Sequence, residues 1–154
     1  MPIRRLALAL LLLATPAAAE PCRGTLYLTI DTGWMSEAEQ IADVLRRQQV
    51  KATLFIADER TFRGDTTLSD SWADFWRARV AEGHAFGSHT WRHGSFRRDT
   101  PDGKVAYRLM DGRQLSLSPA EVCAELRQPD TRFAELTGRA LDPLWRAPGG
   151  RSTP

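Results

Sequence analysis

Strand and helix patterns alternate along the first half of the chain, and this alternation most constrains its fold. Residues 26–30 (LYLTI) and 52–56 (ATLFI) are short, apolar and rich in β-branched or aromatic side chains, which predicts buried strands. A third short strand is predicted at residues 85–88. Between the strands, residues 37–48 and 72–80 carry apolar side chains at helical spacing, which predicts amphipathic helices. The alternation predicts the α/β class, with a parallel sheet and outer helices.

Residues that begin and end helices support these assignments. Ser36 and Glu39 have the spacing of a capping box for the first helix. Ser118 opens a third helix with the same chemistry, followed by a proline at the first helical position. We expect the second and third helices to end at Gly83 and Gly138, because glycine readily takes the left-handed conformation that follows a helix.

The second half of the chain has weaker patterns. Residues 94–116 are polar and charged, and within them residues 107–114 predict a hairpin around an Asp-Gly turn. Pro129 predicts an interruption or a kink in the third helix. A fourth short strand is predicted at residues 144–145.

The N-terminus has the three parts of a secretory signal peptide, which we assign to residues 1–19. A positive region, a short apolar run and a small-residue cleavage site follow one another (Arg4 and Arg5, residues 6–14, and residues 17–19). The apolar run is far shorter than the roughly 20 residues of a membrane-spanning helix, and no lipobox precedes Cys22. We therefore expect a periplasmic or secreted domain over residues 20–154, without a stable membrane anchor after cleavage.

Removal of Arg4 and Arg5 with the leader brings the formal charge of +2 to zero. A near-neutral chain gives no support for nucleic-acid binding, which depends on basic side chains that neutralise phosphates. An oxidising compartment would allow Cys22 and Cys123 to form a disulfide. Two free, buried thiols are the alternative, and the sequence leaves both open, as it does the oligomeric state.

Chemically capable residues follow three of the predicted strands. Asp31, His89 and Arg146 each lie at or just past the carboxyl end of a strand, where parallel β/α folds collect their active sites. His89 and His93 share one face if their segment forms a helical turn, which would offer a metal two nitrogen ligands. For an isolated pair, the alternative is two ordinary surface or core histidines. His84 directly precedes a strand, and we expect it to be structural.

Three motifs, in order along the chain, resemble those of the polysaccharide deacetylase family (NodB homology, carbohydrate esterase family 4). Residues 29–33 (TIDTG), 89–93 (HTWRH) and 146–150 (RAPGG) are similar to that family's T-F-D-D-G, H-[ST]-x-x-H and R-x-P-x-G. The resemblance spans roughly residues 24–151. It implies a deformed (β/α) barrel, which we expect to be partial and C-terminally incomplete because the family's last two motifs are not among these residues.

The resemblance also implies a role for each matching residue. His89 and His93 correspond to ligands of a divalent metal, with zinc the first expectation, that polarises an acetyl carbonyl and activates water. Asp31 corresponds to the catalytic base, and Arg146 corresponds to the residue that pairs with this base and orients it. The backbone N–H of Gly149 corresponds to an oxyanion-hole donor.

Thr32 departs from the family pattern, which has its third metal ligand, an aspartate, at that position. A neutral hydroxyl is a poorer ligand than a carboxylate. Three outcomes follow: water fills the gap in a weakened metal site, Asp31 turns to ligate the metal and is lost as a base, or the site holds no metal.

Together these features predict an exported hydrolase that removes acetyl groups from amide or ester positions of a glycan, with an acetylated polysaccharide as its partner. Trp34 and Trp91 are candidates to stack on a sugar ring, although packing is the more common role of tryptophan. The alternatives are a catalytically impaired carbohydrate-binding relative and a fragment without function.

Overall fold

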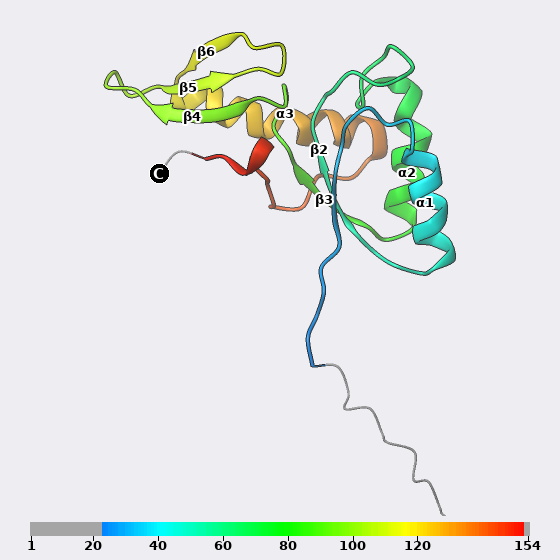
Figure 1. The fold of residues 1–154 in the computed structure, drawn as a ribbon. Helices are drawn as coiled ribbons and strands as arrows, with labels where there is room; N and C mark the ends of the chain where they lie inside the picture. Colours follow the sequence, from blue (N-terminus) through cyan, green and yellow to red (C-terminus); the bar gives the residue numbers. More distant parts are fainter. Residues whose placement is uncertain (1–22, 153–154) are drawn as a thin grey trace, which may run out of the picture.

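A computed structural model describes residues 23–152, and its centre is a parallel sheet of three strands (Figure 1). In spatial order the strands are β1 (Thr29–Asp31), β2 (Thr53–Ile56) and β3 (Ala85–Ser88). Their register pairs Asp31 with Phe55 and Ile56 with Ser88, so the carboxyl ends of the strands lie along one edge. The predicted parallel α/β architecture is confirmed.

A second, antiparallel sheet lies beside the first (Figure 1). In spatial order its strands are β4 (Ser95–Asp99), β5 (Val105–Arg108) and β6 (Gln114–Leu117). The hairpin predicted over residues 107–114 is confirmed as the β5–β6 connection, with Gly112 at a positive φ of 88°. β4 was not predicted, because only Phe96 of its five residues is buried. Its charged side chains leave no alternation of apolar and polar residues that would indicate a strand.

Helices connect and cover these strands. In chain order they are α1 (Ala38–Arg47), the 3₁₀ helix η1 (Asp70–Trp72), α2 (Ala73–Ala81), α3 (Pro119–Thr137) and the 3₁₀ turn η2 (Pro148–Gly150). In Figure 1, α1 and α2 lie on the side of the parallel sheet away from β4–β6, and α3 extends from one sheet to the other.

Aromatic side chains fill the space between the parallel sheet and the helices. Trp72, Trp76, Phe86 and Phe133 are each at most 2% exposed and lie in one cluster with Ile56 of β2. Burial of one such side chain contributes about 1.5–3 kcal/mol. This packing holds α2 and α3 against the sheet and so fixes where the strands end.

The first strand is shorter than predicted. Leu26 and Tyr27 are 94% and 79% exposed, and β1 begins only at Thr29. Within residues 23–152, β1 is the edge strand of its sheet and pairs only with β2. The first residues of the apolar run 26–30 therefore lie outside the sheet, because no second strand of the described segment packs beside them.

The capping box predicted for α1 from Ser36 and Glu39 is wrong. The N-cap is Glu37, one residue later than the box requires, and no side chain caps the helix there. The box of α3 is confirmed, because Ser118 Oγ accepts from the backbone N–H of Glu121 and the Glu121 carboxylate accepts from the Ser118 N–H.

α3 is continuous through Pro129, so the predicted interruption is wrong. Proline removes one backbone donor, but Pro129 is fully buried and tertiary packing keeps the helix intact up to Gly138. Gly138 ends the helix with a φ of 76°, as predicted. The strand predicted at residues 144–145 is reduced to a single bridge between Trp145 and Ser88.

The predicted signal peptide and Cys22 lie outside the described residues, so the leader and the disulfide stay predictions. Cys123 is exposed on α3 and not buried, which excludes the alternative of two buried thiols. Among residues 23–152, no helix is long and apolar enough to cross a membrane.

Candidate functional site

The carboxyl edge of the parallel sheet brings Asp31 together with Arg146, which is distant in sequence. The backbone N–H of Arg146 donates to the Ser88 carbonyl at 2.9 Å, which fixes the arginine beside β3. Its guanidinium donates to Asp31 Oδ1 and to Thr29 Oγ1, both at 2.7 Å. The Asp31 and Arg146 side chains are 37% and 35% exposed, so the ion pair is accessible to a ligand.

His89 and His93 face each other next to this ion pair. Their Nε2 atoms are 3.1 Å apart. His89 Nε2 also lies 3.7 Å from Asp31 Oδ2. Four residues predicted from the sequence therefore form one cluster, in which the Asp31 carboxylate lies between a guanidinium and an imidazole.

The two histidines meet through an irregular loop and not on a helical turn. Residues 89–93 contain no helix, and Thr90 and His93 have positive φ values of 66° and 51°. Residues other than glycine rarely adopt this conformation, which costs about 1–3 kcal/mol and persists only where the surroundings enforce it.

A buried polar network enforces the conformation of this loop. The Glu125 carboxylate accepts from the backbone N–H and the guanidinium of Arg92. The Tyr107 hydroxyl lies 3.1 Å from Glu125 and 3.2 Å from Thr90 Oγ1, and it accepts from the Gly94 N–H at 2.8 Å. Burial raises the pKa of Tyr107 to about 12, so it remains a donor. A Cβ at Gly94 would lie 2.3 Å from the Tyr107 ring, which explains the glycine.

The tautomer of His89 follows from its surroundings. Burial lowers the pKa of this imidazole, whose side chain is 3% exposed, so it is neutral at pH 7. Its Nδ1 lies 2.9 Å from the Arg146 carbonyl, which can only accept. The hydrogen is therefore on Nδ1, and Nε2 presents a lone pair to His93.

Glu59, which the sequence patterns did not single out, completes the cluster. Its Oε2 lies 3.0 Å from His93 Nδ1. Its Oε1 accepts from the Thr32 hydroxyl at 3.0 Å, and Thr32 Oγ1 accepts from the Ala57 N–H at 3.0 Å. A signal was available, because Glu59 comes three residues after Ile56, the last residue of β2, at the same edge as the other site residues.

His93 cannot satisfy both of its neighbours while it is neutral. With its hydrogen on Nδ1, its Nε2 lone pair faces that of His89. With its hydrogen on Nε2, its Nδ1 lone pair faces the Glu59 carboxylate. Nδ1 is buried and has no well-aligned hydrogen bond within residues 23–152. A cation held by both Nε2 atoms removes the conflict, so the pair fits two nitrogen ligands of a divalent metal.

The rest of a metal's coordination shell is not supplied by side chains of the described segment. No group of three or more His, Cys, Asp or Glu residues there is arranged to hold a metal. Thr32 has no carboxylate, and its hydroxyl is engaged by Glu59 and Ala57. The donor set therefore fits a metal bound through His89 and His93, with water or substrate at the remaining positions.

The other predicted site residues lie at the margins of the cluster. Gly149 lies in η2, three residues after Arg146, with a φ of 66° that favours glycine. Trp91 packs against the main core. Trp34 is 59% exposed, so of the two tryptophans it is the one with a ring open to a ligand.

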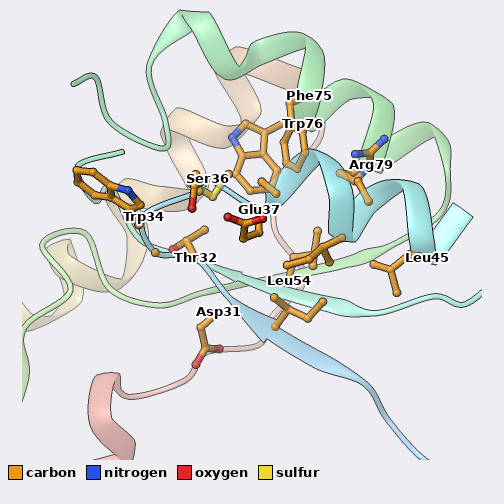
Figure 2. A pocket seen from close by; sticks show the side chains of 16 residues that line it. Asp31, Thr32, Trp34, Ser36, Glu37, Leu45, Leu54, Phe75, Trp76 and Arg79 are labelled. Atoms are coloured by element: carbon orange, nitrogen blue, oxygen red, sulfur yellow. The ribbon is translucent and has the colours of Figure 1, made fainter. Parts of the chain in front are cut away.

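An apolar cavity of about 280 Å³ lies between α1, α2 and the sheet (Figure 2). Its walls include Leu45, Leu54, Phe75 and Trp76, and Asp31 is at its rim. Figure 2 shows the Asp31 carboxylate turned away from these apolar side chains. Asp31 and Thr32 therefore border both the cavity and the polar cluster, whereas His89, His93 and Arg146 do not line the cavity.

His84 is structural, as predicted, and makes stability depend on pH. It is buried, and its Nδ1 accepts from the Ala52 N–H at 3.0 Å. Burial lowers the pKa of His84, although the nearby Glu82 opposes this shift. The unfolded chain, with a histidine pKa of about 6.5, then binds this proton more readily than the folded chain. Stability is fully present above that value and is lost as pH falls below it.

We expect the melting temperature of the metal-free protein to fall when pH is lowered from about 7.5 to about 5.5. His84→Gln retains an acceptor for Ala52 but does not titrate, so its melting temperature should depend less steeply on pH. Thermal denaturation followed by circular dichroism measures both slopes. Equal slopes in the two proteins would contradict the assignment to His84.

Comparisons with known proteins agree with this geometry. The sequence model of the polysaccharide deacetylase family matches residues 18–154. An uncharacterised 30.6 kDa protein from the fumA 3′ region of Geobacillus stearothermophilus is 26% identical over 132 residues, which are 85% of this chain and 40% of the relative.

Solved structures share the fold, and two of them serve as examples. A family 4 acetyl xylan esterase from Clostridium thermocellum, solved with a cobalt ion, aligns with a TM-score of 0.59 at 21% identity, over 83% of this chain and 50% of that one. A chitin deacetylase from Colletotrichum lindemuthianum aligns with a TM-score of 0.58 at 27% identity, over 81% of this chain and 46% of that one. The chain thus spans half or less of the length of these relatives, consistent with a partial (β/α) barrel. Since the family match covers almost all of its residues, the chain belongs to the polysaccharide deacetylase family.

Proposed function

We propose that the protein is an exported, metal-dependent polysaccharide deacetylase, with its domain over residues 20–154 after a signal peptide, and that it acts in the periplasm or outside the cell. Its partner is an acetylated glycan, as the names of the acetyl xylan esterase and the chitin deacetylase suggest. The observation that carries the proposal is the Asp31–Arg146 ion pair beside the facing His89 and His93 imidazoles.

The predicted site residues have complementary tasks in the hydrolysis of an acetamide or an acetate ester. His89 and His93 would hold a divalent metal, zinc in the first place, which would supply Lewis acidity for the carbonyl and the attacking water. Asp31 accepts the proton of that water, and Arg146 holds Oδ1 so that Oδ2 faces the histidines. The Gly149 N–H donates to the developing oxyanion, and Trp34 offers its exposed ring to a sugar.

A carbohydrate-binding relative without activity is the second candidate, and Thr32 is the observation that favours it. A hydroxyl stands where the family has a metal-binding carboxylate. If the metal site is too weak to be occupied, the protein would lose hydrolytic activity but keep the surface that binds the glycan.

Acetate release tests the proposed function. We expect the purified protein to release acetate from N-acetylated chito-oligosaccharides or from acetylxylan, to lose this activity with a chelator and to regain it with zinc or cobalt. His89→Ala should abolish acetate release, whereas His84→Gln, at a histidine outside the site, should retain it. Glycan binding without acetate release from either substrate would favour the second candidate.

A further inference from the structure

We infer that Glu59 is the carboxylate that compensates for the one missing at Thr32, and that it holds His93 so that Nε2 is the nitrogen offered to a divalent cation. The inference rests on the proposed function for the presence of a metal. It adds a residue that lies in none of the three sequence motifs.

The position of Glu59 is set by the residue that replaces the missing ligand. Thr32 Oγ1 accepts from the Ala57 N–H and donates to Glu59 Oε1, so the hydroxyl connects the backbone just after β2 to the carboxylate. Glu59 is only 16% exposed, and its second oxygen lies 3.0 Å from His93 Nδ1. Thr32 therefore positions Glu59, and we do not assign Thr32 as a metal ligand.

Glu59 selects the tautomer of His93 that can bind a metal. A carboxylate can only accept, so its contact with Nδ1 favours the hydrogen on that nitrogen and leaves Nε2 with a lone pair. His89 reaches the same state through the Arg146 carbonyl. His89 Nδ1 is hydrogen-bonded to the Arg146 carbonyl, and His93 Nδ1 is in electrostatic contact with the Glu59 carboxylate at 3.0 Å. Each imidazole thus has an acceptor oxygen behind Nδ1 and presents Nε2 to a common point, as metal-bound histidines usually do.

Glu59 also restores the charge that Thr32 removes. One carboxylate, Asp31, lies 3.7 Å from His89 Nε2, and the other, Glu59, lies 3.0 Å from the ring of His93. Two negative charges flank the histidine pair although the first motif contains only one aspartate. A dication at the two Nε2 atoms would therefore have a second carboxylate nearby, behind the His93 ring at Nδ1 and not in the place of Thr32.

Titration calorimetry with Zn²⁺ or Co²⁺ alone tests this positioning role. We expect Glu59→Gln to weaken metal binding by about 10–100-fold, the usual cost of removing an acceptor behind a ligand histidine. Thr32→Val, which releases Glu59, should weaken it by about 2–10-fold. In the Glu59→Gln background, Thr32→Asp should restore binding, because it returns a carboxylate to the site. Melting curves without metal check that each variant is folded.

Glu82→Gln is the matched control, because Glu82 also lies beside a histidine, His84, but away from the site. It should bind metal as the wild type does. If Glu59→Gln also binds like the wild type while His93→Ala does not bind, the inference is overturned and the proposed function stands. If the wild type itself binds neither metal, both are overturned.

Discussion

Asp31→Asn should lower kcat/KM for acetate release by about 10²–10⁴-fold, the range that one general base contributes. Asparagine has the size of aspartate and still offers Oδ1 to Arg146, so the contacts that position this side chain are retained. It cannot take up the proton of the attacking water. The loss should therefore appear in kcat more than in KM, and initial rates of acetate release over a range of glycan concentrations separate the two.

Asp43→Asn provides the control for this prediction. Asp43 is an aspartate on α1 whose contacts are the exposed ion pairs with Arg46 and Arg47. Surface pairs of this kind are worth about 0–1 kcal/mol, so this variant should be as active as the wild type. Full activity of Asp31→Asn would show that Asp31 is not the base.

The location of the site could be predicted because it depends on local patterns. Asp31 and His89 each follow a short apolar run, and such runs form neighbouring strands whose carboxyl ends share one edge. Arg146 joins them through a single bridge, which needed only the recognition of one more short apolar segment. The position of a residue that directly follows a strand is determined by the position of that strand in the sheet.

The contacts within the site could not be predicted, because they depend on distant residues. From the sequence, His89 and His93 share one face only if their segment forms a helical turn. The structure brings them together in a loop instead, where Glu125, more than 30 positions later, accepts from the Arg92 N–H. Glu59 could have been considered from its place just after β2, but its contacts could not be predicted from the sequence. Its importance comes from the replacement at Thr32, and only the fold brings these two side chains together.

Glu125→Ala should destabilise the protein by about 2–4 kcal/mol. Glu125 is 2% exposed and accepts from the Arg92 backbone and guanidinium, and its Oε2 lies 3.1 Å from the Tyr107 hydroxyl. Each buried donor left without an acceptor costs about 1–3 kcal/mol, although Tyr107 retains Thr90 as a second acceptor. The free energy of unfolding from urea titrations measures the loss. Glu135→Ala, on the same helix but 57% exposed in its pair with Arg132, should cost about 0–1 kcal/mol.

Glu125→Ala should also weaken metal binding, because the network that it breaks keeps Thr90 and His93 at positive φ. A loop that relaxes toward ordinary backbone angles no longer keeps the two Nε2 atoms 3.1 Å apart. Glu125→Gln distinguishes the two effects, since it retains an acceptor for the Arg92 N–H but removes the charge that pairs with the guanidinium. We expect it to lose stability and keep most of the affinity for Zn²⁺. If both variants lose stability but bind Zn²⁺ like the wild type, the loop is held by its own packing and not by Glu125.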